Sequence, residues 1–205
     1  MSIWPAGKPA GVILAGGLSR RMGGGNKALR VLAGRTLLSR VIERLAPQCG
    51  ALAINANGGA DLFEDYDPPV IADGFSGFAG PLAGVLAGMD WAAEQGAECV
   101  VSVSVDTPFI PEDLVWRLLD ARGRSGLAIA ASPDPQGLLR DHPTCALWPV
   151  ALRDDLHAAL ESGQHRIGQF AASYDPGRAV FHSGAIDPFL NLNTPDDLKR
   201  AERLL

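Results

Sequence analysis

A glycine-rich segment close to the N-terminus has the residue types that bind a chain of phosphates. It reads LAGGLSRRMGGGNK over residues 14–27 and continues from the apolar run at residues 11–14. Glycine lets backbone amides approach an anion, and arginine and lysine side chains add charge-assisted hydrogen bonds. We therefore predict a triphosphate site here. A plain glycine loop with solvated arginines is the alternative at this point.

Two familiar phosphate loops do not fit this segment. A Walker A loop needs Ser or Thr after its lysine, whereas Lys27 is followed by Ala28. A Rossmann loop begins directly at the end of a strand, whereas Gly23 comes eight residues after Ala15. The segment is therefore predicted to be a long loop between a strand and a helix, and neither a kinase-type phosphate loop nor an NAD site is supported.

Three further candidate residues stand where short apolar runs end. These residues are Asp106, Asp73 and Asn55. In open α/β sheets, ligands bind beyond the carboxyl ends of the strands, and a carboxylate there can hold Mg²⁺ together with substrate phosphates. The amide of Asn55 offers a donor and an acceptor, which suits the edge of a base or ribose. For both aspartates, a residue that merely begins a loop is the alternative.

Short apolar runs alternate with helical patterns along the chain, which predicts an α/β fold with three layers and a mainly parallel sheet. The length of 205 residues suits one domain over residues 1–205. Residues 132–143 are predicted to form a long loop. Proline is expected at the first position of three helices, at Pro81, Pro111 and Pro195. The expected strands cover 11–15, 51–55, 69–72, 99–105, 127–131, 144–148 and 179–181, and the expected helices cover 36–46, 81–94, 111–122, 149–161, 166–172 and 195–204.

Composition and charge argue against large anionic partners. The net charge is −5, although seven cations and a single acid lie between Arg20 and Arg44. A local basic segment in an acidic chain fits a small anion better than nucleic acid or a membrane surface. The three cysteines form no CxxC pair, and neither a signal peptide nor an apolar run of membrane-spanning length is found. We expect a cytoplasmic protein with buried free thiols.

The motifs together resemble one enzyme family. The loop signature Leu14-Ala15-Gly16-Gly17-x-Ser19-x-Arg21-Met22-Gly23, with Lys27 after it, is similar to that of nucleotidyltransferases with a GT-A-like, Rossmann-like fold. Within this superfamily the chain resembles the molybdenum cofactor guanylyltransferases over nearly its whole length. The more specific segments are INAN at 54–57, GPLAG at 80–84, DTPFIP at 106–111, DHPT at 141–144 and NLNTP at 191–195.

The resemblance implies a reaction and a division of the site. The chain would transfer GMP from GTP to molybdopterin, or to its molybdenum-loaded form, and release pyrophosphate. The N-terminal half would bind GTP and the C-terminal half molybdopterin. Catalysis would fall to Lys27, Asp106 and Arg21, with Asp106 as the ligand of the Mg²⁺ cofactor. The implied nucleotide contacts are Leu14, Ala15, Gly16, Gly17, Lys27, Asn55, Asp73 and Asp106, and the implied pterin-side residues are His142, Arg140, Arg166, Asn191 and Asn193.

The assignment of the pterin-side residues rests mainly on the resemblance. Asn191 and Asn193 are expected on a strand with both side chains on one face, where they could orient phosphates or the metal, but this segment is also a strong helix-entry signal. His142 has no other histidine at zinc-ligand spacing, and lone histidines are usually structural. Arg140 and Arg166 could anchor a phosphate or simply be surface charges.

The chain departs from the family pattern at one position, and two other functions are possible. The family usually has an acidic residue where this chain has Asn26. A sibling nucleotidyltransferase, making a CDP-alcohol, a nucleotide sugar or the cytosine form of the cofactor, is compatible with the loop. A non-catalytic nucleotide-binding module is less so, because a binder has little need of both Asp106 and Lys27. Expected partners besides the substrates are other cofactor-synthesis proteins and molybdoenzyme chaperones.

Overall fold

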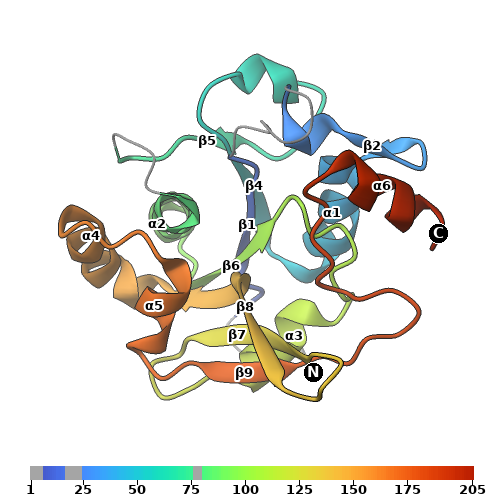
Figure 1. The fold of residues 1–205 in the computed structure, drawn as a ribbon. Coiled ribbons are helices and arrows are strands. Elements are labelled where there is room, and N and C mark those ends of the chain that lie inside the picture. Colours follow the sequence, from blue (N-terminus) through green and yellow to red (C-terminus); the bar gives the residue numbers. More distant parts are fainter. Residues whose placement is uncertain (1–6, 17–24, 76–79) are drawn as a thin grey trace.

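A mainly parallel sheet forms the centre of the molecule. The computed structural model describes residues 7–16, 25–75 and 80–205 (Figure 1). Within these ranges, seven strands form one sheet in the order β5-β4-β1-β6-β8-β7-β9, and β2 pairs with β3 in a small separate sheet. The pairs β1–β4, β1–β6, β4–β5 and β7–β9 are parallel, whereas β8 runs antiparallel to β6 and to β7. The strands are β1 (Ala10–Leu14), β2 (Val31–Leu32), β3 (Arg35–Thr36), β4 (Ala51–Asn55), β5 (Val70–Ile71), β6 (Cys99–Ser104), β7 (Ala128–Pro133), β8 (Leu139–Pro149) and β9 (Gly177–Val180).

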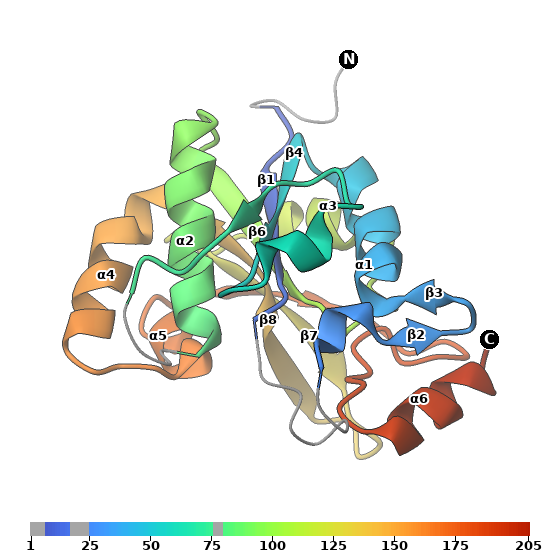
Figure 2. The same ribbon diagram turned by 90° about the horizontal axis from the view of Figure 1, so that it is seen from above.

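Helices cover both faces of this sheet (Figures 1 and 2). On one face α1 and α3 pack against Ile13 and Val101, with α6 at the edge of the same core; on the other, α2, α4 and α5 pack against Val12 and Val100. The predicted three-layer α/β fold is therefore confirmed. The helices are α1 (Leu37–Leu45), α2 (Pro81–Glu94), α3 (Leu114–Asp120), α4 (Arg153–Glu161), α5 (Ile167–Ala172) and α6 (Pro195–Glu202), and short 3₁₀ helices cover Lys27–Leu29, Ala46–Gln48, Ala60–Phe63 and Val150–Leu152.

The register of the central strands brings their carboxyl ends to one level. Leu14, the last residue of β1, lies opposite Asn55 of β4 on one side and opposite Ser104 of β6 on the other. Asn55 and the residues just after Ser104 are therefore neighbours along one edge of the sheet. Adjacent strands are about 4.8 Å apart, so β4 and β6 stand roughly 10 Å apart across β1.

Two glycines let helix α2 lie close to this sheet. A Cβ at Gly88 would come within 2.7 Å of Val12, and a Cβ at Gly84 would come within 2.3 Å of the Asn55 side-chain oxygen. Either contact would force the helix away from the strands, because real Cβ atoms do not approach so closely. Gly84 thus keeps a place for the side chain of Asn55 at the sheet edge.

The prediction of a loop over residues 132–143 is wrong. These residues extend β7 and β8 into a hairpin whose turn is held by Asp134, which accepts from the amides of Gln136 and Leu138 at 2.9 Å each. Pro143 is tolerated inside β8 because the register with β7 shifts between His142 and Ala146. A proline there removes no ladder hydrogen bond to β7.

Two helix starts also differ from the predictions. Pro81 and Pro195 do begin their helices, but α3 begins at Leu114 rather than at Pro111. Gln48, the last residue of the 3₁₀ helix Ala46–Gln48, donates to the Pro111 carbonyl and accepts from the Val115 amide. This side chain fixes residues 111–113 as a turn that leads into α3. Similarly, the helix expected from residue 149 is a 3₁₀ turn until α4 begins.

The cysteines behave as expected for structural thiols. All three are free, with Cys49 and Cys145 buried and Cys99 partly buried. Burial raises the pKa of the Cys49 and Cys145 thiols to about 12, so neither is a thiolate near neutral pH. In the described part of the chain, no helix is both long and apolar enough to span a membrane.

Candidate active site

A charged cluster lies at the carboxyl end of β6, and we call it the Asp106 cluster. The Lys27 ammonium donates to Asp106 Oδ2 at 2.8 Å and to Asn193 Oδ1 at 2.6 Å. The Lys27 and Asp106 side chains are only 16% and 19% exposed. Thr107 Oγ1 lies 3.3 Å from both Asp106 Oδ1 and Asn191 Oδ1 and completes the cluster. Three segments far apart in sequence therefore meet around Asp106.

Local structure fixes each of these segments. Lys27 begins a 3₁₀ turn that is capped by Asn26, whose side-chain oxygen accepts from the Ala28 amide at 2.9 Å. The Asp106 carbonyl accepts from the Leu192 amide at 2.9 Å and so ties residues 191–193 to the end of β6. Just beyond, Thr194 and Asp197 form a capping box at the start of α6.

The strand predicted for Asn191 and Asn193 is wrong, because this segment has no regular secondary structure. Its Leu192 amide bonds to the loop carbonyl of Asp106 instead of to a strand partner. The two asparagines nevertheless both reach the Asp106 cluster, Asn191 through Thr107 and Asn193 through Lys27. Side chains two residues apart thus reach the same cluster without strand pairing.

A second cluster lies at the end of β4, and we call it the Asp73 cluster. In it a carboxylate is bonded to neutral amide side chains. Asp73 accepts from Asn55 Nδ2 at 2.8 Å and from Asn57 Nδ2 at 2.5 Å, one on each carboxylate oxygen. The Asp73 amide donates back to Asn57 Oδ1 at 2.9 Å. Asn55 is buried, next to the space left by Gly84. The carboxylate is thus held by two amide side chains.

The Asp106 cluster has the donor chemistry that a hard divalent cation needs. Asp106 Oδ2 and Asn193 Oδ1 both lie within bonding distance of one cationic group, the Lys27 ammonium. Carboxylate and amide oxygens suit Mg²⁺, which commonly uses one or two carboxylates, water and substrate phosphates. Across residues 7–16, 25–75 and 80–205, no group of three or more His, Cys, Asp and Glu could hold a metal by itself. The residues therefore fit a metal that arrives with phosphates rather than a closed metal centre.

The backbone between the two clusters takes part in the sheet. The Leu14 carbonyl accepts from the Val105 amide at 3.1 Å, and the Ala15 amide donates to the Asn55 carbonyl at 2.9 Å. These backbone groups therefore already make hydrogen bonds within the sheet, and a bound base would contact groups that the sheet also uses. Gly16 is exposed just beyond them. Gly17 and Arg21 lie outside the described residues.

His142 lies apart from the two clusters, in the hairpin of β7 and β8. Its Nε2 is 2.8 Å from Ser132 Oγ, and its ring is stacked on Phe189 with the ring centres 4.4 Å apart. Burial, and to a lesser degree the charge of Arg140, lowers the pKa of His142 below its ordinary value, so the ring is mainly neutral near pH 7. Arg140 itself and Arg166, which precedes α5, are exposed.

Four residues that hold predicted site residues in place had no predicted role. Asn57 and Thr107 were visible in the INAN and DTP segments, where a polar residue close to a candidate side chain is a usable signal. Ser132 belongs to the segment predicted as a loop, and Phe189 lies in a segment with no helical or strand periodicity. Neither residue could be recognised from the sequence. Their roles depend on tertiary contacts that no spacing reveals.

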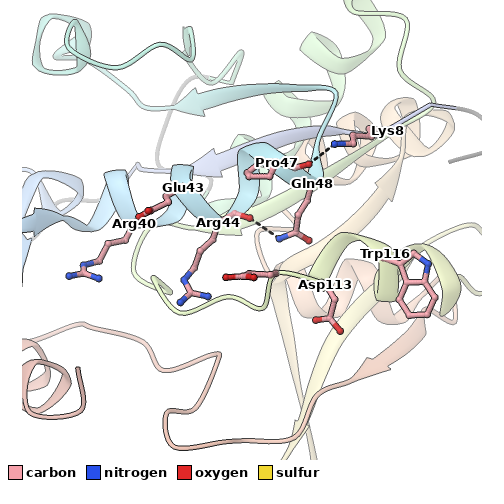
Figure 3. A pocket seen from close by; sticks show the side chains of 9 residues that line it. Lys8, Arg40, Glu43, Arg44, Pro47, Gln48, Asp113 and Trp116 are labelled. Atoms are coloured by element: carbon pink, nitrogen blue, oxygen red, sulfur yellow. Dashed lines mark hydrogen bonds between the residues drawn. The ribbon is translucent and has the colours of Figure 1, made fainter. Parts of the chain in front are cut away.

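A hollow of about 750 Å³ lies away from these clusters, at the amino ends of the strands (Figure 3). Lys8, which precedes β1, and Asp113 and Trp116 of the α3 region line it. Its three cations already bond within the chain, since Lys8 donates to the Pro47 carbonyl, Arg40 to the Leu32 carbonyl and Arg44 to the Ile110 carbonyl. The hollow is therefore polar, but the cations that line it already bond within the chain.

Comparison with known sequences gives consistent matches over most of the chain. The model of the MobA-like NTP transferase domain matches residues 11–177. A protein of Rhodopseudomonas palustris (strain HaA2), named molybdenum cofactor guanylyltransferase, is 52% identical over 201 residues, covering 96% of this chain and 92% of the relative. A protein of the same name from Bradyrhizobium sp. (strain ORS 278) is 49% identical and covers 95% of this chain and 92% of its own length.

Solved structures share the fold at lower sequence identity. Molybdopterin-guanine dinucleotide biosynthesis protein A from Archaeoglobus fulgidus superposes with a TM-score of 0.72 at 24% identity, covering 95% of this chain and 97% of that one. The 2-C-methyl-D-erythritol 4-phosphate cytidylyltransferase of Thermus thermophilus gives the same TM-score at 22% identity, covering 96% and 98%. At these identities the likeness concerns the fold alone.

Proposed function

The chain belongs to the MobA-like NTP transferases and, within them, to the molybdenum cofactor guanylyltransferases, and from this premise we propose that it transfers GMP from GTP to molybdopterin or its molybdenum-loaded form. The product is a guanine dinucleotide form of the cofactor, and pyrophosphate is released. The observation that carries the proposal is the contact of Lys27 with Asp106 and Asn193 at the edge of the sheet. This group lies at the end of β6, and the Asp73 cluster lies across β1, at the end of β4.

The proposed reaction is a single displacement at phosphorus. An oxygen of the terminal phosphate of molybdopterin attacks the α-phosphorus of GTP, and the bond from this phosphorus to the oxygen bridging the β-phosphate breaks. Pyrophosphate leaves with that oxygen. Because the attacking phosphate is already anionic near pH 7, no strong general base is needed. The task of the chain is to hold two polyanions in line and to stabilise the charge that develops.

The Asp106 cluster supplies charge to this step. Lys27 is held beside the carboxylate by two hydrogen bonds, so its ammonium is placed before the phosphates arrive. Mg²⁺ is the metal that we propose for Asp106, and when bound it neutralises phosphate charge. Asn193 and Asn191 orient this group of residues. Arg21 and Gly17 are proposed to complete the phosphate contacts from the preceding loop.

The Asp73 cluster is proposed to bind the guanine or ribose side of GTP. Leu14, Ala15 and Gly16 lie between the two clusters and would contact the base through their backbone. The C-terminal half contributes the pterin side, for which His142, Arg140 and Arg166 are candidates. The proposed division into a GTP half and a molybdopterin half is therefore not strict, because Asn193 reaches Lys27. A cytoplasmic location fits the three free cysteines.

A nucleotide site discriminates against the wrong base because that base leaves polar groups of the site unpaired. A site that matches the donor and acceptor pattern of guanine leaves buried groups without partners when adenine or cytosine enters. We therefore expect GTP to be preferred strongly over ATP and CTP. The cytidylyl alternative is compatible with the loop, and the solved cytidylyltransferase shares only the fold, at 22% identity.

Pyrophosphate release tests the proposal directly. The purified chain is incubated with Mg²⁺ and each of GTP, ATP, CTP and UTP, with and without molybdopterin. We expect release that needs both GTP and molybdopterin. Release that is independent of molybdopterin would identify another acceptor, and nucleotide binding without any release would favour a non-catalytic module.

A further inference from the structure

We propose that Thr107 is a positioning residue that sets the orientation of the Asp106 carboxylate and thereby the affinity of the site for a divalent metal. Thr107 directly follows Asp106 and is only 1% exposed. It does not contact the Lys27 ammonium, which is held by Asp106 and Asn193. The inference rests on the proposed function, because it takes Asp106 as the metal ligand.

The position of the Thr107 hydroxyl explains how it can orient its neighbour. Its Oγ1 lies 3.3 Å from Asp106 Oδ1, the carboxylate oxygen that Lys27 does not use. The terminal torsion of an aspartate is broad, so the carboxylate is not fixed by its own rotamer preference. Contacts on both oxygens, from Thr107 on one and Lys27 on the other, favour one orientation. Oδ2 then faces the cationic position.

The same hydroxyl connects the end of β6 to the segment that carries Asn193. Oγ1 is also 3.3 Å from Asn191 Oδ1, and the Leu192 amide bonds to the Asp106 carbonyl. A hydroxyl has one proton, so it donates to either oxygen but not to both at once. Thr107 therefore bridges Asp106 Oδ1 and Asn191 Oδ1, two acceptors that cannot hydrogen-bond to each other. Loss of the hydroxyl would release Asp106 and Asn191 together.

A purely structural role would give a different pattern of effects. If Thr107 only filled space, its methyl group and volume would matter and its hydroxyl would not. If it positions the carboxylate, Thr107→Ser keeps the function and Thr107→Val, of nearly equal volume, loses it. Residues that orient metal ligands typically change metal affinity by roughly 10- to 100-fold when removed.

The matched control is a buried hydroxyl on the strand that precedes Thr107. Ser102 in β6 is fully buried and bonds to the Thr144 carbonyl and to the indole of Trp148, away from Asp106. Ser102→Ala also leaves a buried group without its partner, so it should lower the melting temperature. It has no contact through which it could change the metal dependence.

The experiment measures GTP affinity by calorimetry at a series of Mg²⁺ concentrations, without molybdopterin, so that no transfer occurs. For Thr107→Val we expect the Mg²⁺ concentration that gives half of the metal-linked gain in GTP affinity to rise roughly tenfold or more. Thr107→Ser and Ser102→Ala should keep the wild-type value. In transfer assays with molybdopterin, the half-saturating Mg²⁺ concentration should shift in the same way.

The outcomes separate this proposal from the one on which it rests. An unchanged Mg²⁺ dependence in Thr107→Val overturns the role of Thr107, and so does an equal shift in Ser102→Ala. Failure of Thr107→Val and Thr107→Ala to fold, while Thr107→Ser folds, would make the hydroxyl structural and also overturn it. If Asp106→Asn keeps the wild-type Mg²⁺ dependence, the proposed metal site itself is wrong, whatever Thr107 does.

Discussion

Two aspartates stand at strand ends on the same edge of the sheet, and their surroundings differ in charge. Asp73 accepts from the amide side chains of Asn55 and Asn57. Asp106 accepts from the Lys27 ammonium on one oxygen and from the Thr107 hydroxyl on the other. One carboxylate is thus surrounded by neutral donors, and the other is already paired with a cation.

The difference indicates what each carboxylate is prepared to bind. A carboxylate whose partners are neutral amides carries a negative charge that these partners do not offset. It can accept hydrogen bonds from the N–H groups of a base or the hydroxyls of a ribose. A carboxylate beside a lysine lies where positive charge is gathered, which suits phosphates and the metal that accompanies them. The two clusters are separated by β1, so a single nucleotide can reach both.

The largest effect should come from Asp106→Asn. The swap keeps the size and one oxygen but removes the charge that would hold Mg²⁺ against the phosphates. We expect GMP transfer to fall by more than roughly 10³-fold, beyond the loss of a single charge-stabilising donor. The measurement is GMP transfer to molybdopterin over a Mg²⁺ titration, together with a thermal melt. Asp113→Asn, at the hollow on the opposite edge, is the control and should transfer GMP at the wild-type rate (Figure 3).

Lys27→Ala should be somewhat less damaging. It removes one preorganised cation from the phosphate side, which corresponds to a loss of roughly 10²–10³ in turnover. Single-turnover rates at saturating GTP measure this effect without a contribution from binding. Lys8→Ala is the matched control, since Lys8 lies at the other end of β1 and donates to the Pro47 carbonyl. Near-normal rates in Lys27→Ala would show that its position beside Asp106 has no catalytic consequence.

Asp73→Asn should act on binding rather than on turnover. The substitution removes a charged acceptor, whose hydrogen bonds are worth about 1.5 kcal/mol or more, so KM for GTP should rise roughly tenfold. The value of kcat and the Mg²⁺ dependence should stay close to wild type. A large fall in kcat with an altered Mg²⁺ dependence would assign Asp73 to the metal side and remove the distinction between the two clusters.

The smallest effect should come from Asn26→Asp, which restores the usual family residue. In the structure Asn26 acts through its side-chain oxygen, which caps the turn at Lys27 by accepting from the Ala28 amide. Aspartate can accept the same hydrogen bond. The transfer rate should therefore change by less than about tenfold, or ~1.4 kcal/mol. A much larger gain would mean that a negative charge, and not only a cap, is required beside Lys27.

Much of the fold could be predicted because its strands are short apolar runs closed by polar residues. The runs that became β1, β4 and β6 were found almost to the residue, and the family resemblance is confirmed by relatives that are about half identical. Strands at 127–131 and 144–148 were predicted, but their extension into the hairpin of β7 and β8 was missed because its Pro and Gly residues imitate a loop. Only the register shift next to Pro143 makes strand pairing possible there, and a single sequence does not contain that information.

The candidate site was predicted as a set of residue types without its contacts. Lys27 and Asp106 were chosen for their place in the sequence, and the structure brings them together at 2.8 Å. The segment of Asn191 and Asn193 was expected to be a strand, because alternate polar residues with an apolar neighbour imitate one. Its true conformation depends on the bond between the Leu192 amide and the Asp106 carbonyl, 86 residues earlier in the chain.

The most direct test of the proposed reaction is the product formed from an equimolar mixture of GTP and CTP. The chain is given molybdopterin, Mg²⁺ and both nucleotides, and the dinucleotides formed are separated and weighed by mass spectrometry. We predict that the guanine dinucleotide dominates, with one pyrophosphate released for each dinucleotide, and that Asp106→Asn forms neither product. Equal amounts of the guanine and cytosine dinucleotides would contradict the guanylyl assignment.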